Sequence, residues 1–596
     1  MENIPRFHTL ISHTKCLFRT WNLVHSFAST WLVGLGFTTL AASLIPLAYV
    51  YLTKEVVDTF ATLQSSPNDS LPRFALLIGI LVAIIITSQI LDAVSNWITM
   101  GFSDVISDNI QTQIHHLSIR AEFKFFEIPS FQDQLYHATA GAEDQFSSTI
   151  DNLFTLLRNA VTLLAMITVI AGFSLWLPLI LIVASVPTMF LIMAQNRKGY
   201  ELQKALVPSE RKADYYDWLI QSSDAAAEIR TFGLGDLFAG RYQRIRSRVR
   251  TKQLDLEKRH LIHRFGSHLF GLTIVGGAMS FVIMRAVSGQ ATMGDVAMFY
   301  RTIKYSQDLG TEFVKGLASL HKNAVFLNEF YQFIDTDHTS PEVSDPVSFP
   351  ERLQRGIKFQ DVTFSYPGTE KQVLKQLNLS IPAGKMTAIL GPNGSGKSTV
   401  LKLIAKLYRD YEGSILIDDE NLHQISDLSM KKGSSFLFQD PMEYHFSAQE
   451  NITLSEESPP PRSDKIGDAT KAAAAGTIIE KLPNKEQTLL GKWFQEGYEL
   501  SGGEWHRIAT ARTLYGKKQL VVMDEPTSSL DPWAEINWTK RIRKHLTDHT
   551  VVIITHRVSV AQLADHICVM ENGQLAEQGS HEELMEHQGT YACINT

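Results

Sequence analysis

The chain is 596 residues long, more than one ordinary domain holds, and so predicts two or more domains. Its formal net charge of -7 is mildly acidic, so the charge balance gives no indication of a nucleic-acid partner. Its three cysteines are scattered in no metal-ligand or disulfide spacing, which is typical of a protein in a reducing compartment.

The first half of the chain holds long uncharged apolar runs, whereas the second half has the composition of a soluble enzyme. A bilayer core about 30 Å thick needs roughly 20 apolar residues per helix, and several runs approach that length. The uncharged stretch from Ala160 to Ala194 would reach about 50 Å as a single helix, so it must fold back on itself. Gly172 to Pro178 is the natural place for this reversal. The expected spans are residues 31–53, 74–93, 157–173, 177–195 and 266–286.

Residues 296–317 are a sixth candidate span that hydropathy alone would reject, because it holds Arg301, Lys304, Asp308, Glu312 and Lys315. Lys and Arg cluster near both ends of the segment between the fourth and fifth spans, which places that segment and the amino terminus in the cytoplasm. Only an even number of spans then keeps the soluble half in the cytoplasm as well. We expect six spans in a plasma-membrane domain over residues 1–330, a linker over 331–350 and a soluble domain over 351–596.

Three polar segments of the first half have separate interpretations. Residues 9–25 precede the first span and predict either a helix on the inner membrane surface or a disordered lead-in. Residues 95–155 and 196–264 keep helical spacing, so we expect helices that extend the spans into the cytoplasm, with ordinary loops as the alternative. Within them, Phe125–Phe131 and Ala227–Gly233 are the candidates for contact with the soluble half.

The second half alternates apolar strands with helices, a pattern typical of an α/β domain built on a parallel sheet. A strand-like run at 386–390 is followed directly by G-P-N-G-S-G-K-S and then by a predicted helix over 399–407. Backbone N–H groups of such a loop cradle phosphates, while Lys397 reaches the β- and γ-oxygens and the Ser398 hydroxyl ligates Mg²⁺. The expected ATP-binding residues here are Gly391, Pro392, Asn393, Gly394, Ser395, Gly396, Lys397, Ser398 and Thr399.

A second buried strand, residues 520–523, delivers Asp524 toward the metal ion. Glu525 follows at the position where a base would polarise a water molecule against the γ-phosphate. An Asp-Glu pair is common on protein surfaces, but the strand and the phosphate loop together favour an ATPase site that uses Mg²⁺.

Further motifs follow in order: Gln439 before Asp440-Pro441, L-S-G-G-E at 500–504, S-S-L-D at 528–531, and His556. With the phosphate loop and the Asp-Glu pair, this set is similar to the nucleotide-binding domain of ATP-binding cassette (ABC) transporters. Six spans fused ahead of it resemble the exporter type of that superfamily. The fold class implied is an α-helical polytopic membrane domain with long cytoplasmic extensions, followed by an α/β P-loop NTPase domain of ABC type.

The resemblance implies a role for each further motif residue. Tyr366 would stack on the adenine, and an aromatic residue of a strand core is the alternative. Gln439 would contact Mg²⁺ and the nucleophilic water. His556 would hydrogen-bond the γ-phosphate, whereas a lone histidine is otherwise an ordinary core residue. Asp531 would lie at the contact between two nucleotide-binding domains.

In this family the L-S-G-G loop closes on ATP held by the phosphate loop of another domain, so Ser501, Gly502 and Gly503 would hold a neighbour's γ-phosphate. The glycines let backbone donors approach, and the following helix supplies a positive dipole end, which explains the absence of a lysine. One chain carries one copy of each half-site, so two chains are required. A homodimer is expected because Glu525, His556 and the L-S-G-G loop are all intact, and a heterodimer is the alternative.

The implied function is an ATP-driven primary active exporter that moves a peptide or an amphipathic small molecule out of the cytoplasm by alternating access. Segments 125–135 and 224–232 resemble exporters of lantibiotic-type or other peptides. A lipid flippase and an ATP-gated channel or regulator have the same architecture and are the alternatives. The apolar half disfavours a soluble ABC ATPase that acts on DNA or ribosomes.

The charged side chains of the sixth span have two interpretations. In the first, Arg301, Lys304, Asp308 and Glu312 line a polar pathway for a substrate of both charge signs, because ionised groups in a span usually face a water-filled cavity. In the second, the charges pair within the helix, Lys304 with Asp308 and Glu312 with Lys315.

Overall fold

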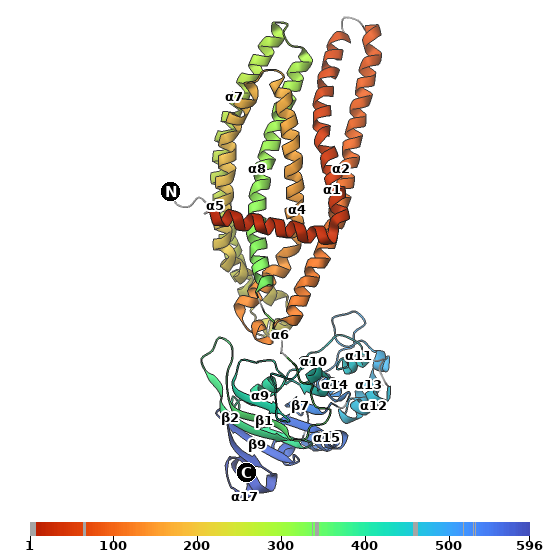
Figure 1. Ribbon diagram of the computed structural model, residues 1–596, viewed down its shortest axis with the longest axis vertical. Helices are drawn as coiled ribbons and strands as arrows, with labels where there is room; N and C mark the ends of the chain where they lie inside the picture. The colour runs from red at the N-terminus through yellow and green to blue at the C-terminus, as the bar shows by residue number, and fades with distance from the viewer. Residues whose placement is uncertain are drawn as a thin grey trace. The chain divides into compact units, whose positions relative to one another are not determined.

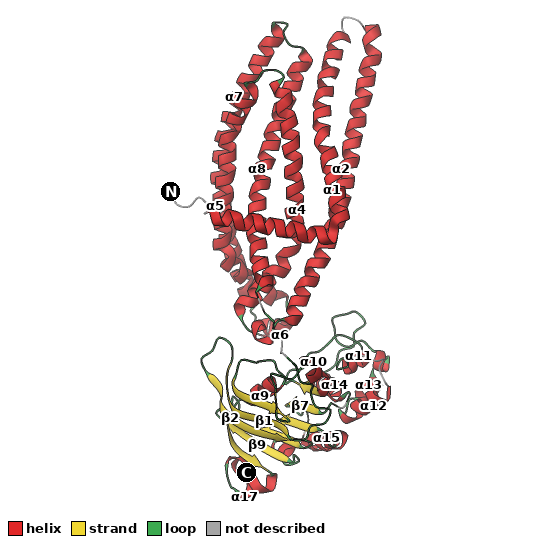
Figure 2. Ribbon diagram, in the orientation of Figure 1, coloured by secondary structure: helices red, strands yellow, loops and turns green. Residues whose placement is uncertain are grey.

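A computed structural model of the chain describes residues 7–63, 67–336, 338–339, 345–456, 463–516, 518–528, 530 and 532–595. Residue contacts divide the chain into a first unit, Met1–Ile119 with Gln134–Asp337, and a second unit, Arg120–Asp133 with His338–Thr596. Figure 1 shows the long helices of the first unit, and every described strand lies in the second unit (Figure 2). The expected linker overlaps the last long helix, which continues to Asp335, and its residues 337 and 340–344 lie outside the described residues.

Long helices build the first unit, and each of the six expected spans falls on a different one. Four segments are long and apolar enough to cross a membrane, among the residues that could be searched: Thr14–Leu63, Ser70–Arg120, Asp144–Ala171 and Gly235–Val287. The helices are α1 (Phe7–Leu63), α2 (Pro67–Arg120), α4 (Pro129–Ala171), α5 (Leu177–Gln221), α6 (Ser223–Thr231), α7 (Gly235–Val287) and α8 (Met293–Asp335).

Helix α1 bends at Ala28, where the backbone leaves helical geometry (φ -130°, ψ 31°). Residues 9–25 lie within α1 and are therefore helical rather than a disordered lead-in. In Figure 1 the part of α1 before the bend runs across other helices of the unit. The reversal between the third and fourth spans is confirmed, because α4 ends at Ala171 and α5 begins at Leu177. The Arg285 guanidinium donates to the Phe173 carbonyl oxygen at 2.8 Å and anchors this turn to α7.

The start of α8 is held against α1 by polar contacts that require a glycine. Asp58 of α1 accepts hydrogen bonds from the backbone N–H of Gly294 at 2.7 Å and from the Thr292 hydroxyl at 2.9 Å. Lys54 pairs with Asp295 at 2.8 Å, and Asp295 forms a capping box with Thr292. A Cβ at Gly294 would lie 2.4 Å from the Lys54 carbonyl oxygen, so a larger residue would push the two helices apart.

Two sheets organise the second unit. The strands are β1 (Gly356–Ser365), β2 (Gln372–Pro382), β3 (Met386–Leu390), β4 (Glu412–Ile417), β5 (Glu420–Asn421), β6 (Ser434–Leu437), β7 (Leu520–Asp524), β8 (Thr550–Ile554), β9 (His566–Glu571) and β10 (Gln574–Gly579). The antiparallel sheet has the order β2-β1-β4-β5, and the larger sheet has the order β10-β9-β3-β8-β7-β6. Strands β3, β7 and β8 pair in parallel, and all their residues are buried, as their apolar runs predict. Their carboxyl ends therefore meet at one edge of the sheet.

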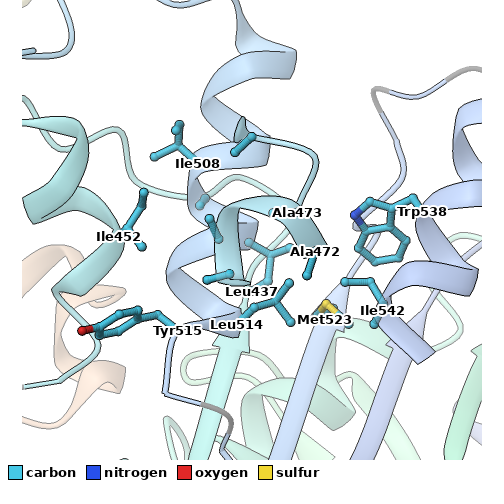
Figure 3. Packing of buried hydrophobic residues seen from close by; sticks show 14 of the residues in the cluster. Leu437, Ile452, Ala472, Ala473, Ile508, Leu514, Tyr515, Met523, Trp538 and Ile542 are labelled. Atoms are coloured by element: carbon cyan, nitrogen blue, oxygen red, sulfur yellow. The ribbon is translucent and has the colours of Figure 1, made fainter. Parts of the chain in front are cut away.

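Three apolar clusters pack the helices of this unit against its sheets, and the largest holds α11 to α16 against the larger sheet. Figure 3 shows Ile508 and Leu514 of α14 among Ile452, Met523 and Trp538. The helices are α9 (Lys397–Ile404), α10 (Asp427–Gly433), α11 (Ala448–Thr453), α12 (Ser463–Ala472), α13 (Gly476–Lys481), the 3₁₀ helix Lys485–Gln487, α14 (Gly502–Leu514), α15 (Pro532–His545), α16 (Val558–Ala561), α17 (His581–Glu586) and α18 (Thr590–Asn595).

The short segment between α2 and α4 belongs to the second unit and contains α3 (Phe123–Phe126). Lys124 forms an ion pair with Asp410 at 2.7 Å, and the Phe125 ring packs edge-on against His338 with centroids 4.9 Å apart. The expected contact of this segment with the soluble half is therefore confirmed. The other candidate segment forms α6, which belongs to the first unit.

Candidate nucleotide site

The phosphate-type loop follows β3, and three of its glycines have positive φ: Gly391 at 150°, and Gly394 and Gly396. Gly394 and Gly396 have φ of 80° and 102°. A Cβ at Gly396 would lie 2.6 Å from Cδ2 of Leu374, whereas a Cβ at Gly394 would meet nothing within 4 Å. Gly396 thus lets the loop pack against β2, while Gly394 leaves open space on the side where a ligand would approach.

Lys397 begins α9 and is buried beneath the loop. Its Nζ donates to the carbonyl oxygens of Gly391 and Pro392, both at 2.9 Å. Burial lowers the pKa of the Lys397 ammonium, and the carboxylates of Asp524 and Glu525 oppose that shift. Of the three ammonium donors, described residues use two, which leaves one for an anionic oxygen.

Asp524 ends β7, and its carboxyl lies beside the hydroxyl of Ser398. Burial raises the pKa of the Asp524 carboxyl, and the neighbouring Ser398 hydroxyl opposes the shift. A bound cation would favour the ionised carboxylate, and a hydroxyl beside a carboxylate offers the hard oxygen ligands that Mg²⁺ prefers. Asp524 and Ser398 therefore fit a magnesium ion.

Glu525 directly follows β7 and faces His556, which follows β8. The Nε2 atom of His556 lies 3.2 Å from Oε1 of Glu525, and both side chains are partly exposed. Glu525 has φ of 47°, a region that costs a non-glycine residue about 1–3 kcal/mol. Its backbone N–H donates to the Ile554 carbonyl oxygen at 2.9 Å, which holds this conformation in place. A carboxylate presented in this way beside a histidine suits a general base that orients water.

A cavity of about 510 Å³ collects most of the expected site residues. Those that line it are Tyr366, Asn393, Gly394, Gly396, Lys397, Ser398, Thr399, Gln439, Glu525 and His556. Three further groups of expected residues do not line the cavity. Asp524 lies beside Ser398, which does line it, and the carbonyl oxygens of Gly391 and Pro392 accept hydrogen bonds from Lys397. Ser395 is buried.

Five further residues line this cavity without belonging to a sequence motif: Lys371, Gln372, Val373, Lys375 and Asn572. They lie on or beside β2 and in the turn between β9 and β10, so only the packing of the two sheets brings them to the loop. The two lysines add positive charge to a cavity of a size suited to a nucleotide polyphosphate. Two basic residues shortly after Tyr366 were the one signal available in the sequence.

Tyr366 is half-buried: it packs against the apolar core and also lines the cavity. Its hydroxyl is 2.9 Å from Oγ1 of Thr399, and Nζ of Lys402 lies 5.0 Å from its ring centre. The ring packs edge-on against Tyr408 with centroids 5.4 Å apart. Because Tyr366 also lines the cavity, it is more than an aromatic residue of the strand core.

The L-S-G-G loop does not line this cavity, although it is well formed. Ser501 caps α14: its backbone N–H and its hydroxyl both hydrogen-bond Glu504 Oε2, at 2.9 and 2.8 Å. Ser501 and Gly502 are exposed, and a Cβ at Gly502 would meet nothing within 4 Å. The loop therefore presents a capped helix N-terminus to solvent. Asp531 lies outside the described residues.

Arg557 ties the segment after Glu525 to the segment that carries His556. Its guanidinium donates to the carbonyl oxygens of Ser528 at 3.2 Å and Leu530 at 2.9 Å. No sequence motif singled out this residue, since an arginine after a histidine is unremarkable by itself.

The charged residues of α8 divide between two faces. Neither expected helical pair, Lys304 with Asp308 or Glu312 with Lys315, is among the ion pairs of these described residues. Arg301, Asp308 and Glu312 line a cavity among α1, α2, α4 and α8. Lys304 lines a different cavity, between α5, α7 and α8, which it shares with Asp308 and mostly apolar side chains. Within one chain Lys304 therefore lines a different cavity from Arg301 and Glu312, and a single pathway lined by all four residues stays a prediction.

Long apolar helices joined to a second unit with a phosphate loop define a membrane protein with a nucleotide-binding domain. The family model described as "ABC transporter transmembrane region" matches residues 32–305, and the model described as "ABC transporter" matches residues 374–528. The chain belongs to the ABC transporter superfamily and has the exporter-type arrangement of one membrane domain fused to one nucleotide-binding domain.

Curated relatives match over nearly the whole chain. The subtilin transport ATP-binding protein SpaT of Bacillus subtilis is 26% identical over 575 residues, which cover 96% of this chain and 92% of the relative. The nisin transport ATP-binding protein NisT of Lactococcus lactis subsp. lactis is 23% identical over 584 residues (97% and 95%). The ATP-dependent lipid A-core flippase of Escherichia coli K12 is 26% identical over 529 residues (87% of each).

A solved structure shares the fold. It is that of a bacterial Atm1-family ABC exporter with ATP bound, with a TM-score of 0.75, 23% sequence identity, and coverage of 96% of this chain and 98% of that chain. At this identity the likeness shows the fold.

Proposed function

We propose that this chain exports its substrate across the plasma membrane as a homodimer, with its amino terminus and second unit in the cytoplasm. The observation that carries the proposal is the divided site. Lys397, Glu525 and His556 face one cavity, whereas Ser501 and Gly502 stand exposed outside it. A second copy related by two-fold symmetry would supply the missing loop to each cavity, so two equivalent sites would form.

The residues of the chain would bind and orient the nucleotide as follows. Lys397 places a positive charge at the phosphates, and Tyr366 offers its ring to the base. Ser398 and Asp524, with Gln439, would hold Mg²⁺, which supplies charge neutralisation when bound. These assignments are supported by the shared cavity and by the position of the Ser398 hydroxyl beside Asp524.

Two residues would handle the attacking water. Glu525 would orient it and accept its proton at a carboxylate oxygen. His556, 3.2 Å from Glu525, would hydrogen-bond the terminal phosphate and hold the carboxylate in position. Asp531 would lie at the contact of the two chains.

Dimer closure gives ATP a way to drive the membrane domain. Moving a two-state transporter from 1:99 to 99:1 takes about 5.5 kcal/mol of differential affinity. Contacts from Ser501, Gly502 and Gly503 of the second chain would exist only in the closed state. They would therefore make ATP bind the closed state more tightly than the open state. Two sites with a few charge-assisted hydrogen bonds, each about 1.5–3 kcal/mol, are sufficient.

The substrate class is a peptide in this proposal. The relatives named for subtilin and nisin transport support a lantibiotic-type peptide. A lipid is the second candidate, because a relative of similar identity is named as a lipid A-core flippase.

Replacing the proposed base tests the enzyme. Wild type and Glu525→Gln would be compared in lipid nanodiscs by phosphate release, and we expect a loss of at least about 100-fold. Glu412→Gln, which neutralises an exposed carboxylate of the same unit, should keep full activity. Wild-type hydrolysis no faster than that of Glu525→Gln would contradict the base assignment.

Two transport measurements separate an exporter from an ATP-gated channel. An exporter should show ATP-dependent uptake into inside-out vesicles, whereas a channel should show ion current through a planar bilayer.

A further inference from the structure

A cavity of about 630 Å³ lies among α1, α2, α4 and α8 of the first unit. Every residue that lines it belongs to one of four expected spans, and most of these side chains are polar. Five ionisable residues line it: Asp92, Arg158, Arg301, Asp308 and Glu312. Ionised groups are costly in a membrane span unless they face water or a partner, so this wall faces an aqueous space rather than lipid.

Negative charge predominates in the cavity, because three carboxylates face two guanidinium groups. None of the five is in an ion pair with another described residue of the unit. One of the two guanidinium groups is held in place by an aromatic ring: Arg301 stacks over the Tyr49 ring, 3.8 Å from its centre. The carboxylates of Asp92, Asp308 and Glu312 therefore remain available to a cationic ligand.

Asn159 supplies an independent sign of a ligand. It lines the cavity, is 1% exposed, and its amide N–H₂ donates to Glu312 Oε2 at 3.5 Å. Because a carboxylate only accepts, the amide must turn its nitrogen to Glu312, and its Oδ1 then has no hydrogen-bond partner among the described residues. A buried acceptor without a donor is costly, and a donor group in the cavity would satisfy it.

Arg301 has a hydrogen-bond donor without an acceptor. Its Nε is buried and has no acceptor among the described residues, although the guanidinium plane is fixed by Tyr49. Arg301 and Glu312 are eleven residues apart on α8, which is about 16 Å along a helix. The cavity thus presents acceptors at the level of Asn159 and Glu312 and an unused donor at the level of Tyr49.

We infer that this cavity binds a basic peptide: Asp92, Asp308, Glu312 and the Oδ1 atom of Asn159 receive an ammonium or guanidinium group, and Nε of Arg301 donates to a peptide carbonyl oxygen. The inference rests on the proposed export function and narrows its substrate class. Phosphatidylethanolamine also carries an ammonium group, but its acyl chains would need an apolar wall, which this mostly polar lining does not provide.

Peptide binding without nucleotide tests the inference directly. A short labelled lysine–leucine peptide and its glutamate–leucine counterpart would be titrated into the full chain in phosphatidylcholine nanodiscs, with empty nanodiscs subtracted, and read by fluorescence anisotropy. We expect wild type to prefer the lysine peptide by at least about tenfold. The Asp308→Asn/Glu312→Gln variant should lose this preference, and Asp308→Lys/Glu312→Lys should reverse it. Glu329→Gln, which neutralises an exposed carboxylate of α8 outside the cavity, should bind like wild type.

Other results would overturn the inference. Equal binding of the two peptides would do so, as would an unchanged preference in Asp308→Asn/Glu312→Gln. Stimulation of ATP hydrolysis by phosphatidylethanolamine that depends on these carboxylates, with no binding of the lysine peptide, would assign the cavity to a lipid instead. Basal ATP hydrolysis, measured in parallel, shows that each variant is folded. Its absence from wild type would contradict the proposed function, while the nucleotide-free titration would still decide what the cavity binds.

Discussion

Arg557, the residue after His556, forms an ion pair with Glu535 of α15, a carboxylate that is only 1% exposed. Glu535 also accepts a hydrogen bond from Ser559. Because the same guanidinium holds the carbonyl oxygens of Ser528 and Leu530, one partly buried pair connects the segments that follow β7 and β8. This pair is a structural support for the site rather than a part of its chemistry.

Removing one partner of this pair should destabilise the second unit. In Arg557→Ala, Glu535 would be buried without a cation, which costs about 2–3 kcal/mol and should lower the thermal midpoint of ATPase loss. Adding Glu535→Gln should restore more than half of the loss, since the uncompensated charge is then gone. Arg541→Ala is the control, because Arg541 is exposed and lies on α15 like Glu535. A double variant as unstable as Arg557→Ala would contradict the ion-pair explanation.

Mixed dimers test whether each site is built from two chains. Lys397→Ala and Ser501→Arg should each abolish hydrolysis in a homodimer, because every site then lacks one half. Co-expression of differently tagged chains, with tandem purification that selects the mixed dimers, should recover about half of wild-type activity, because each mixed dimer carries one intact site of two. No recovery in mixed dimers would indicate that Lys397 and Ser501 of the same chain serve one site.

Gly294 should be intolerant of a methyl group. An added Cβ would meet the Lys54 carbonyl oxygen at 2.4 Å, so Gly294→Ala should force α8 from α1 and cost about 1–3 kcal/mol. Gly310→Ala lies on the same helix with nothing within 4 Å of the new Cβ, and it should be neutral or stabilising by up to about 1 kcal/mol. Thermal unfolding of the full chain in detergent measures both. Equal midpoints for the two variants would show that the helices adjust at no cost.

The cap of α14 should show a characteristic pH dependence. Hydrogen bonds from the backbone N–H and then the hydroxyl of Ser501 lower the pKa of Glu504 below its usual value of 4.5. A carboxyl with a depressed pKa in the folded state contributes stability above its unfolded pKa, and this contribution disappears as the pH falls through the lower folded value. Glu504→Gln should therefore be less stable than wild type at neutral pH, and the difference should shrink below pH 4.5. The thermal midpoints of the two proteins across this range give the measurement, and a difference that does not change with pH would argue against the carboxylate cap.

Local patterns were enough to predict the buried strands that carry the nucleotide site. The apolar run at 386–390 coincides with β3, and the buried runs before Asp524 and His556 lie in β7 and β8. Strands buried on both faces are continuous apolar runs, and the turn and helix that follow carry the glycines and the lysine at fixed offsets. Information of this kind is contained within a few neighbouring residues.

Contacts between distant segments could not be predicted in the same way. Helical spacing placed Arg301, Lys304, Asp308 and Glu312 near one face of a span, but a helix has neighbours on both sides of such a face, and Lys304 faces a different cavity. Whether a charge meets Asp92 of α2 or an apolar side chain of α5 depends on how the helices pack.

The sequence by itself determined that this chain is an ABC-type ATPase joined to membrane helices, because those features follow from short motifs and from the length of apolar runs. Only the tertiary structure decided which side chains share a space. Asn159 and Glu312, or Arg557 and Glu535, lie far apart in sequence and meet because packed helices and sheets bring them together. Such contacts cannot be predicted from a local sequence pattern, because the burial and pairing that stabilise them exist only after the chain has folded.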